Sequence, residues 1–386
     1  MSSGMFLPST VRLVPFAFLA LLGVACGGRT ASDYDRALAE SRRASSAGRF
    51  GEASEAYARA AKAATKERDR DYAALLSAME KARAGDVAQA LRELDVLAKR
   101  TPSTRASEEA AYKAADLRRK TGAGPEALAA MEAFLLAHPQ SPFAYPALSH
   151  VVRAEEGDTS DARAAAARGH ALLGRLAEKV PAASPLGQRI AYERAARTEP
   201  REEKVKAYVA LANRFPYPIG AYWDDSLFTA ANLEVEAGHP NEAIALLSRL
   251  LAERETSDVI GTYQRPKYTP AKLRIAEIQA QKLNDRAAAR KTLHELYTTF
   301  TTSDRRDDAL WTEAKLFRQD HMEDDACAVL RILVSDFPDS RYVPCVVASC
   351  PQASRPKKSK APATCHAYLT RDGAGPAVAP AEAPSP

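Results

Sequence analysis

The sequence of 386 residues predicts an all-α fold. We expect a superhelical solenoid of about eight helix pairs, with a short C-terminal capping helix and a disordered tail. A short apolar frame carries this prediction, because Ala90 is followed four and seven residues later by Leu94 and Leu97. The small residue recurs every 37 residues, at Ala53, Ala90 and Ala127, which is typical of helical repeats. Alternating β-branched runs between hairpin turns, which would predict strands, are nearly absent.

Each copy of this frame predicts a helix, a tight turn and a second helix. Residues four and seven apart lie on one helix face, so Ala90, Leu94 and Leu97 form an apolar stripe. Gly85 ends the preceding helix, since glycine enters the left-handed cap without strain, and Pro102 stops the second helix from continuing. One pair cannot bury its stripe alone, so the pairs must stack.

The frame predicts helices along most of the chain, with Asn284 and His321 replacing the glycine in the last two pairs. The expected pairs are 34–46 with 50–65, 71–84 with 87–99, 107–120 with 125–137, 145–154 with 160–179, 186–197 with 201–215, 223–237 with 241–254, 270–282 with 285–300, and 307–319 with 323–337. The fifth pair fits poorly. It is kept as a divergent repeat, because the 81 residues from Ala162 to Ala243 leave room for two units.

Two kinds of motif resemble a known family. The run from Gly48 to Ala60 resembles the second half of the tetratricopeptide repeat (TPR). The junctions at 337–342 and 138–143, with proline, serine and an aromatic residue, resemble bacterial envelope TPR proteins of the BamD and YbgF type. The resemblance covers roughly residues 33–348. It implies a concave surface that binds protein or peptide partners.

The N-terminus has the features of a secretory signal. Arg12 precedes an apolar run that ends at Ala25-Cys26 and is too short to span a bilayer. The small residue before Cys26 resembles the bacterial lipobox, which implies a signal peptide at 1–25 and a lipidated Cys26 on a tether at 26–32. Gly27, in place of aspartate, favours the outer membrane, with the chain facing the periplasm. The alternative is an ordinary signal peptide with a chance cysteine.

The remaining chain divides by repeat and by composition. Residues 33–216 hold the first five pairs, and residues 217–349 hold the other three and the capping helix at 342–349. Residues 350–386 are rich in lysine, proline and alanine, a composition that cannot bury enough apolar area to offset its entropy. We therefore expect this tail to be largely disordered.

Two breaks in the rhythm mark candidate partner contacts. About nine extra residues lie near 254–270, and the stretch 215–223 is unusually aromatic. Insertions in solenoids often lie at the binding face, where aromatic and arginine side chains are favoured. The candidates are Tyr217, Tyr222, Trp223, Tyr263, Arg265 and Tyr268. We expect Tyr263, Arg265 and Tyr268 to be exposed. The alternative is that the aromatic residues pack between repeats.

The C-terminal cysteines predict disulfides. Cys327, Cys345, Cys350 and Cys365 are even in number and clustered, which in a secreted chain favours disulfides over a zinc site. In an antiparallel hairpin, residues equidistant from the bend lie at the same height. This predicts Cys327 with Cys345, and Cys350 with Cys365, although Cys327 could also reach Cys350.

The sequence offers no catalytic arrangement, so we expect no enzyme, cofactor, metal or small-molecule substrate. A phosphate loop, paired metalloprotease histidines and a serine-nucleophile elbow are missing. The formal charge of +5 over this length indicates no nucleic-acid surface. The resemblance implies an envelope scaffold for outer-membrane protein assembly or for division and wall coordination. Alternatives are an adaptor of a secretion, motility or polysaccharide-export machine, or a helical-repeat enzyme acting on peptidoglycan.

Overall fold

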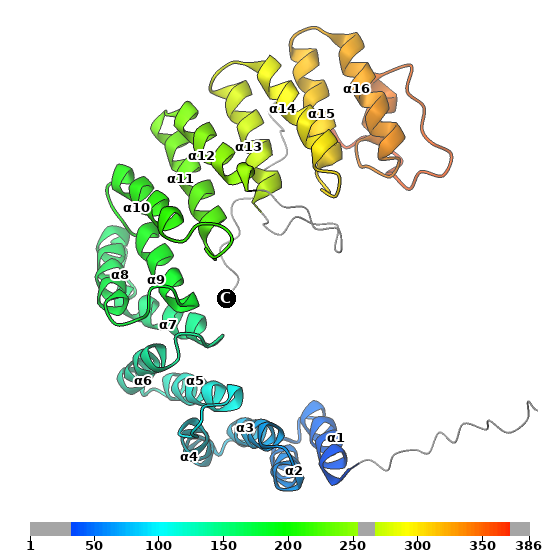
Figure 1. Cartoon of the computed structure of the whole chain (residues 1–386). Helices are drawn as coiled ribbons and strands as arrows, with labels where there is room; N and C mark the ends of the chain where they lie inside the picture. Colours follow the sequence, from blue (N-terminus) through cyan, green and yellow to red (C-terminus); the bar gives the residue numbers. More distant parts are fainter. Residues whose placement is uncertain (1–31, 254–266, 371–386) are drawn as a thin grey trace, which may run out of the picture. The chain divides into compact units, whose positions relative to one another are not determined.

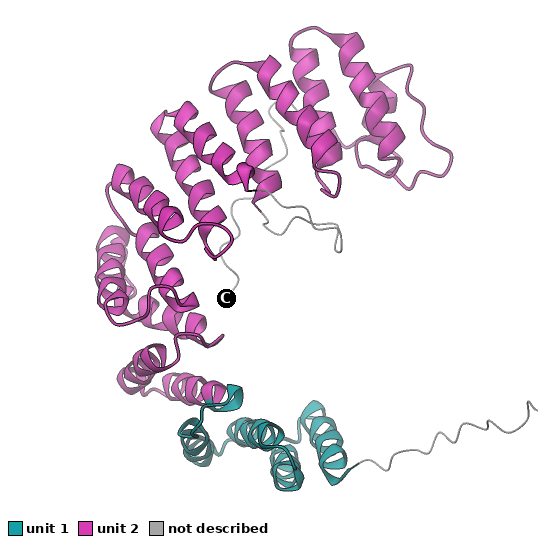
Figure 2. Ribbon diagram, in the orientation of Figure 1, with its two compact units in different colours: residues 1–107 teal, residues 108–386 magenta. Residues whose placement is uncertain are grey.

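The structure is a computed structural model that describes residues 32–253 and 267–370. Every regular element within these residues is a helix (Figure 1). The chain divides into two compact units, residues 1–107 and 108–386 (Figure 2). The predicted all-α class and arrangement in helix pairs are therefore confirmed.

Unit 1 contains two helix pairs packed in series. Its helices are α1 (Asp33–Ser46), α2 (Phe50–Ala63), α3 (Glu67–Arg83) and α4 (Val87–Ala98). The frame residues Ala53, Ala60, Ala90 and Leu94 are completely buried. Ser54 and Ser77 join α2 to α3, because each hydroxyl donates to the other residue's carbonyl oxygen, at 3.0 and 2.9 Å. The small residues thus bring neighbouring helices close, as the frame predicts.

Unit 2 continues the same architecture. Its helices are α5 (Arg105–Lys120, which begins in unit 1), α6 (Gly124–Ala137), α7 (Ala144–Glu156), α8 (Ala162–Ala177), α9 (Pro185–Ala196), α10 (Arg201–Arg214), α11 (Trp223–Ala237), α12 (Pro240–Ala252), α13 (Tyr268–Gln281), α14 (Arg286–Thr299), α15 (Arg306–Gln319), α16 (Glu323–Asp336), α17 (Val343–Ser349) and α18 (Ala367–Thr370). Each helix from α6 to α16 packs on the next one along the chain. Ala127, Ala243, Ala289 and Ala326 are completely buried.

The turns inside the pairs need left-handed backbone, which explains the residue before each frame. Gly85 has a φ of 97°, and Asn284 and His321 reach 55° and 58° at the equivalent point. Asparagine and histidine tolerate this region better than most residues with a side chain. The three residues therefore form the same left-handed turn, as their place in the frame predicts.

The divergent fifth pair is present. Helices α9 and α10 follow the expected spans closely, and α9 packs against both α7 and α8 while α10 packs against α11. Gly187, in the first turn of α9, lies so close to the preceding loop that a Cβ there would be 2.2 Å from the carbonyl oxygen of Pro181. The fifth unit therefore belongs to the solenoid.

The predicted cysteine pairing is wrong, although all four cysteines form disulfides. Cys327 bonds to Cys350, and Cys345 bonds to Cys365, with Cα separations of 5.7 and 4.6 Å. The error lies in the bend, because the six residues 337–342 form the turn and α17 begins only at Val343. Cys345 is therefore close to the bend, whereas Cys350 follows the far end of α17 and lies beside the first turns of α16.

The first part of the tail is ordered rather than disordered. Residues 350–366 form a loop that packs on the last helices, with Ala361 buried in the same apolar cluster as Val343 and Val346. Composition alone underestimates this order, since two disulfides hold the loop. Residues 371–386 lie outside the described residues.

Candidate protein-binding site

The most distinctive polar arrangement in unit 2 runs along α9. Arg189, Glu193 and Arg197 are spaced four residues apart and therefore share one face of the helix. Glu193 accepts from both arginines at 2.5 Å, and Arg197 Nε also reaches Glu156 Oε1 of α7 at 2.6 Å. Because all four side chains are at most one-quarter exposed, this ion ladder joins α7 to α9 out of bulk water.

Aromatic rings surround the first arginine of the ladder. The Arg189 guanidinium donates to the Tyr145 hydroxyl at 2.6 Å and lies 4.1 Å from that ring's centroid. The ring centroids of Tyr222 and Tyr192 lie 5.4 and 5.8 Å from the Arg189 guanidinium carbon. These two rings stack on each other, with their centroids 4.9 Å apart. Burial alone would lower the pKa of Arg189, but the Glu193 carboxylate together with the Tyr222 and Tyr145 hydroxyls outweighs it and raises that pKa. Arg189 is therefore a fixed cation.

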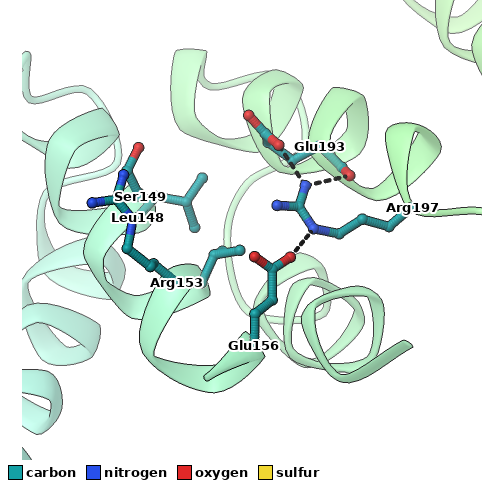
Figure 3. A pocket seen from close by; sticks show the side chains of 7 residues that line it. Leu148, Ser149, Arg153, Glu156, Glu193 and Arg197 are labelled. Carbon is teal, nitrogen blue, oxygen red and sulfur yellow. Dashed lines mark hydrogen bonds and ion pairs between the residues drawn. The ribbon is translucent and has the colours of Figure 1, made fainter. Parts of the chain in front are cut away.

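A cavity of about 200 Å³ opens beside this ladder (Figure 3). Its apolar part comes from Leu148 and Val152 of α7, both buried. The polar lining is Ser149, Arg153, Glu156, Glu193 and Arg197. The two carboxylates are paired with arginine, so an occupant meets a neutral rim above aliphatic carbon. A cavity below the usual 300–1,000 Å³ of ligand pockets suits one side chain of a bound peptide.

A glycine makes room for the ion pair at this cavity. A Cβ on Gly169 of α8 would lie 2.6 Å from Glu156 Oε1 and 2.9 Å from Arg197 Nε. Any side chain here would push against both partners, so the position determines how deeply the pair lies between the helices.

The aromatic stretch 215–223 is held against α9. The buried Gln188 side chain accepts from Ala221 N at 2.8 Å, and a Cβ on Gly220 would lie 1.9 Å from the Phe215 carbonyl oxygen. Trp223 is buried and Tyr217 packs partly buried against it, with ring centroids 5.8 Å apart. Packing between repeats is therefore the correct interpretation for Trp223, whereas Tyr222 belongs to the rings around Arg189.

The exposure expected for Tyr268 is wrong. Its ring is completely buried at the start of α13, and its hydroxyl donates to the Glu253 carbonyl oxygen at 2.6 Å. An aromatic residue that opens the first helix of a pair packs on the pair before it, as Trp223 does. Tyr263 and Arg265 lie outside the described residues, so their predicted contact with a partner stays a prediction.

A second cavity, of about 500 Å³, lies between α14 and α15. His294 Nδ1 lies 3.2 Å from Glu313 Oε2, and the Arg290 guanidinium lies 4.6 Å from the Phe317 ring centroid. Burial raises the pKa of the Glu313 carboxyl more than His294 and Arg290 lower it. This cavity therefore holds a carboxyl group that takes up a proton more readily than one in water.

The junction between α16 and α17 is fastened by carboxylates of α15. Asp308 accepts from the Tyr342 hydroxyl at 2.7 Å and from Arg341 at 2.9 Å, and Asp307 accepts from Ser340 at 2.6 Å. Tyr342 also stacks on Trp311, with centroids 4.8 Å apart. The serine and aromatic residue of the junction motif thus bind back to the preceding pair.

Within residues 32–253 and 267–370, no three histidine, cysteine or acidic side chains are grouped so as to hold a metal ion. None of the helices in these ranges is long and apolar enough to cross a membrane. Arg197 pairs with Glu156 and Glu193 at the first cavity, and His294 pairs with Glu313 at the second.

The comparisons with known proteins agree with a repeat fold. The family model described as tetratricopeptide repeat matches residues 308–340, which is pair α15–α16 and the start of its junction. No curated protein matches the sequence. Together, the matched repeat and the serial helix pairs identify a TPR-type solenoid, a class that typically provides non-catalytic scaffolds for protein interactions.

Solved structures with a similar arrangement of helices have low sequence identity to this chain. A human IFIT1 dimer with PPP-AAAA is 12% identical, with 78% of this chain and 60% of that chain covered and a TM-score of 0.30. A tetratricopeptide repeat protein from Parabacteroides merdae is 12% identical, covering 83% and 99%, with a TM-score of 0.26. The P58(IPK) TPR domain is 15% identical, covering 83% and 88%, with a TM-score of 0.25. Likeness at this level indicates no shared partner.

Sequence reasoning missed the ion ladder. Charges spaced four residues apart, such as Arg189, Glu193 and Arg197, usually mark a solvent-exposed helix face. The available signal was their position in the one pair that lacks the apolar frame. Helix α9 packs through Leu186 and Ile190 and adds the ladder to that contact.

Proposed function

We propose that this chain is a lipid-anchored scaffold of the bacterial outer membrane that faces the periplasm and binds a protein partner in envelope biogenesis. Assembly of outer-membrane proteins, or coordination of division with wall synthesis, is the process that the BamD and YbgF resemblance favours. The observation that carries partner binding is the cavity between α7 and α9, with its aliphatic floor and neutral charged rim.

The charge arrangement argues for a peptide rather than a free small ligand. Each arginine and glutamate of the ladder already has a partner. A small charged ligand would therefore gain little binding free energy by entering the cavity. An aliphatic side chain, in contrast, would cover Leu148 and Val152. Its peptide groups would lie against Ser149 and Arg153 at the rim.

The envelope location is supported by the cysteines. Two disulfides, Cys327 with Cys350 and Cys345 with Cys365, are typical of chains that mature in an oxidising compartment. The lipid anchor rests on the motif at Cys26, which lies outside the described residues. Diacylglycerol with an amide-linked acyl chain would provide the two or more anchors that stable membrane residence needs.

The binding proposal is tested by filling the cavity. Ser149→Trp places a large ring at the rim, and Ala171→Trp on the exposed surface of α8 is the matched control. Each tagged variant is used to capture partners from detergent-solubilised envelopes. We expect Ser149→Trp alone to lose the captured protein while keeping its helical circular dichroism. If both variants capture the partner equally well, the cavity is not part of the binding site.

The anchor is tested separately. Cys26→Ser should abolish incorporation of radioactive palmitate and release the chain from the membrane fraction. Undiminished labelling of the variant would contradict lipidation at Cys26 without touching the binding proposal.

A further inference from the structure

The loop between α17 and α18 carries an unusual concentration of positive charge. Between Cys350 and Cys365 the chain contains Arg355, Lys357, Lys358 and Lys360 and no acidic residue. We call residues 350–365 the basic loop. Disulfides fix both of its ends, through Cys350 to α16 and through Cys365 to α17.

Hydrogen bonds within the basic loop and to the turn between α16 and α17 hold the loop in one conformation. The Arg355 guanidinium donates to the carbonyl oxygens of Ala361 and Pro362, and Ser359 Oγ donates to the Pro338 carbonyl oxygen at 2.5 Å. The backbone N–H of Lys360 donates to Asp339 at 2.6 Å. Such order is unusual for a lysine- and proline-rich segment, which would otherwise remain extended and mobile.

The three lysine side chains point outward from this ordered loop. Lys357, Lys358 and Lys360 are all exposed, and no carboxylate of the described residues forms an ion pair with their ammonium groups. Asp339 contacts the loop, but its carboxylate accepts from the backbone N–H of Lys360 rather than from a lysine side chain. Tyr368 is about half exposed just beyond Cys365, and its ring stacks on His366 at 5.7 Å.

We propose that the basic loop docks on a membrane surface of anionic lipids. The cations available are all lysines, which act as point charges, while the one arginine is occupied by carbonyls of its own loop. Recognition of a defined carboxylate or phosphate usually uses the planar arginine fork in a pocket. The guanidinium of Arg355 is already bound to carbonyl oxygens of the loop, so only the lysines remain for a ligand. Three exposed lysines suit a diffuse layer of headgroup phosphates.

The exposed tyrosine supports the same occupant. Tyrosine rings are enriched at the level of lipid headgroups, where an apolar body and a polar hydroxyl are both accommodated. Tyr368 is about half exposed and follows Cys365, which the disulfide to Cys345 ties to α17, by three residues. This contact lies at the opposite end of the chain from Cys26 and does not rest on the proposed lipid anchor or partner.

The test measures binding of the full chain to vesicles, with Cys26→Ser present so that no acyl chain contributes. Phosphatidylglycerol mixed with phosphatidylcholine is compared with pure phosphatidylcholine. The test variant is Lys357→Gln, Lys358→Gln and Lys360→Gln, and the control is Lys179→Gln, Lys282→Gln and Lys291→Gln. The control removes the same charge from scattered exposed positions of unit 2.

We expect the parent chain to bind anionic vesicles only, and the test variant to bind about 100-fold more weakly at low salt. The control should lose far less, and added salt should weaken parent binding. Equal binding by parent and test variant, or equal losses in both triple variants, would overturn the proposal. Tighter retention of a soluble DNA duplex than of the vesicles would do the same.

Discussion

The fifth and eighth helix pairs of the chain, both in unit 2, share an architecture but differ in the polar interactions that join them to their neighbours. In the eighth pair, α15–α16, the frame residues Ala326, Leu330 and Leu333 are completely buried, and the family model matches this segment. In the fifth pair, α9–α10, the frame is missing. Helix α9 packs on α7 through Leu186 and Ile190, and also through the ion pair from Arg197 to Glu156 and the contact of Arg189 with Tyr145.

The difference shows which interactions a repeat pattern can detect. Small apolar residues at fixed spacing only bring helices together, so they repeat and are easily recognised. At the fifth pair, charges and rings add to the apolar packing of α9 on α7, and the cavity lies beside Glu193 and Arg197. The apolar frame therefore does not predict the cavity between α7 and α9, because the charged residues that line it do not recur in the other pairs.

The largest expected effect tests the apolar packing of the eighth pair. Ala326→Asp places an unpaired charge in a completely buried position and should cost about 3–5 kcal/mol of unfolding free energy. Ser335→Asp, exposed on the same helix, is the control and should change stability little. Urea denaturation followed by circular dichroism gives both values. A near-equal effect of the two variants would mean that the frame does not pack the pairs.

The next effect concerns the covalent closure that only the eighth pair has. Replacing Cys327 and Cys350 together with serine opens a loop of 23 residues and should remove roughly 3 kcal/mol. Hydrogen exchange should accelerate in α16 and α17 and stay unchanged in α9 and α10. Peptide mapping without reductant should recover Cys327 with Cys350 from the parent chain. Recovery of Cys327 with Cys345 would contradict the pairing.

A smaller effect compares the same substitution in both pairs. Arg189→Met removes a buried cation that bonds Tyr145 and Glu193, and should cost about 2 kcal/mol, since Glu193 keeps Arg197. Arg318→Met in α15 removes a more exposed partner of Glu323 and should cost less than about 1 kcal/mol. Denaturation midpoints measure both changes. If Arg318→Met is the costlier change, the ladder does not hold α9 against α7.

How far the sequence predicts the fold follows from which interactions repeat. Helix spans and turns were predictable, because the period of the apolar residues and the left-handed positions, including Asn284 and His321, recur in register. The cysteine pairing was not, since the height of Cys345 depends on how many residues the bend consumes. The frame says nothing about that length.

The candidate site was less predictable still. Tyr268 and Trp223 were chosen as aromatic residues near breaks in the repeat, but such residues also fill the start of the first helix in a pair, where both are buried. Arg189 looked like an ordinary surface charge, because burial of a charged side chain depends on partners from α7 and on the 215–223 loop. Those partners are distant in sequence.

The smallest expected effect is a pH dependence in the eighth pair, at Glu313. Burial raises the folded-state pKa of its carboxyl above the ordinary value, so the folded chain holds this proton more tightly than the unfolded chain. Stability of the parent chain should therefore fall as pH rises from the ordinary pKa through the raised one. Glu313→Gln and Glu313→Leu cannot titrate, so both should lack this fall, whatever their absolute stabilities. Melting temperatures across about pH 4 to 7 provide the comparison. At Glu313 burial outweighs the neighbouring charges, whereas at Arg189 in the fifth pair Glu193, Tyr222 and Tyr145 together outweigh burial and raise the pKa. Parallel curves for parent and variants would show that Glu313 meets water in the folded chain, and would weaken the contrast between the two pairs.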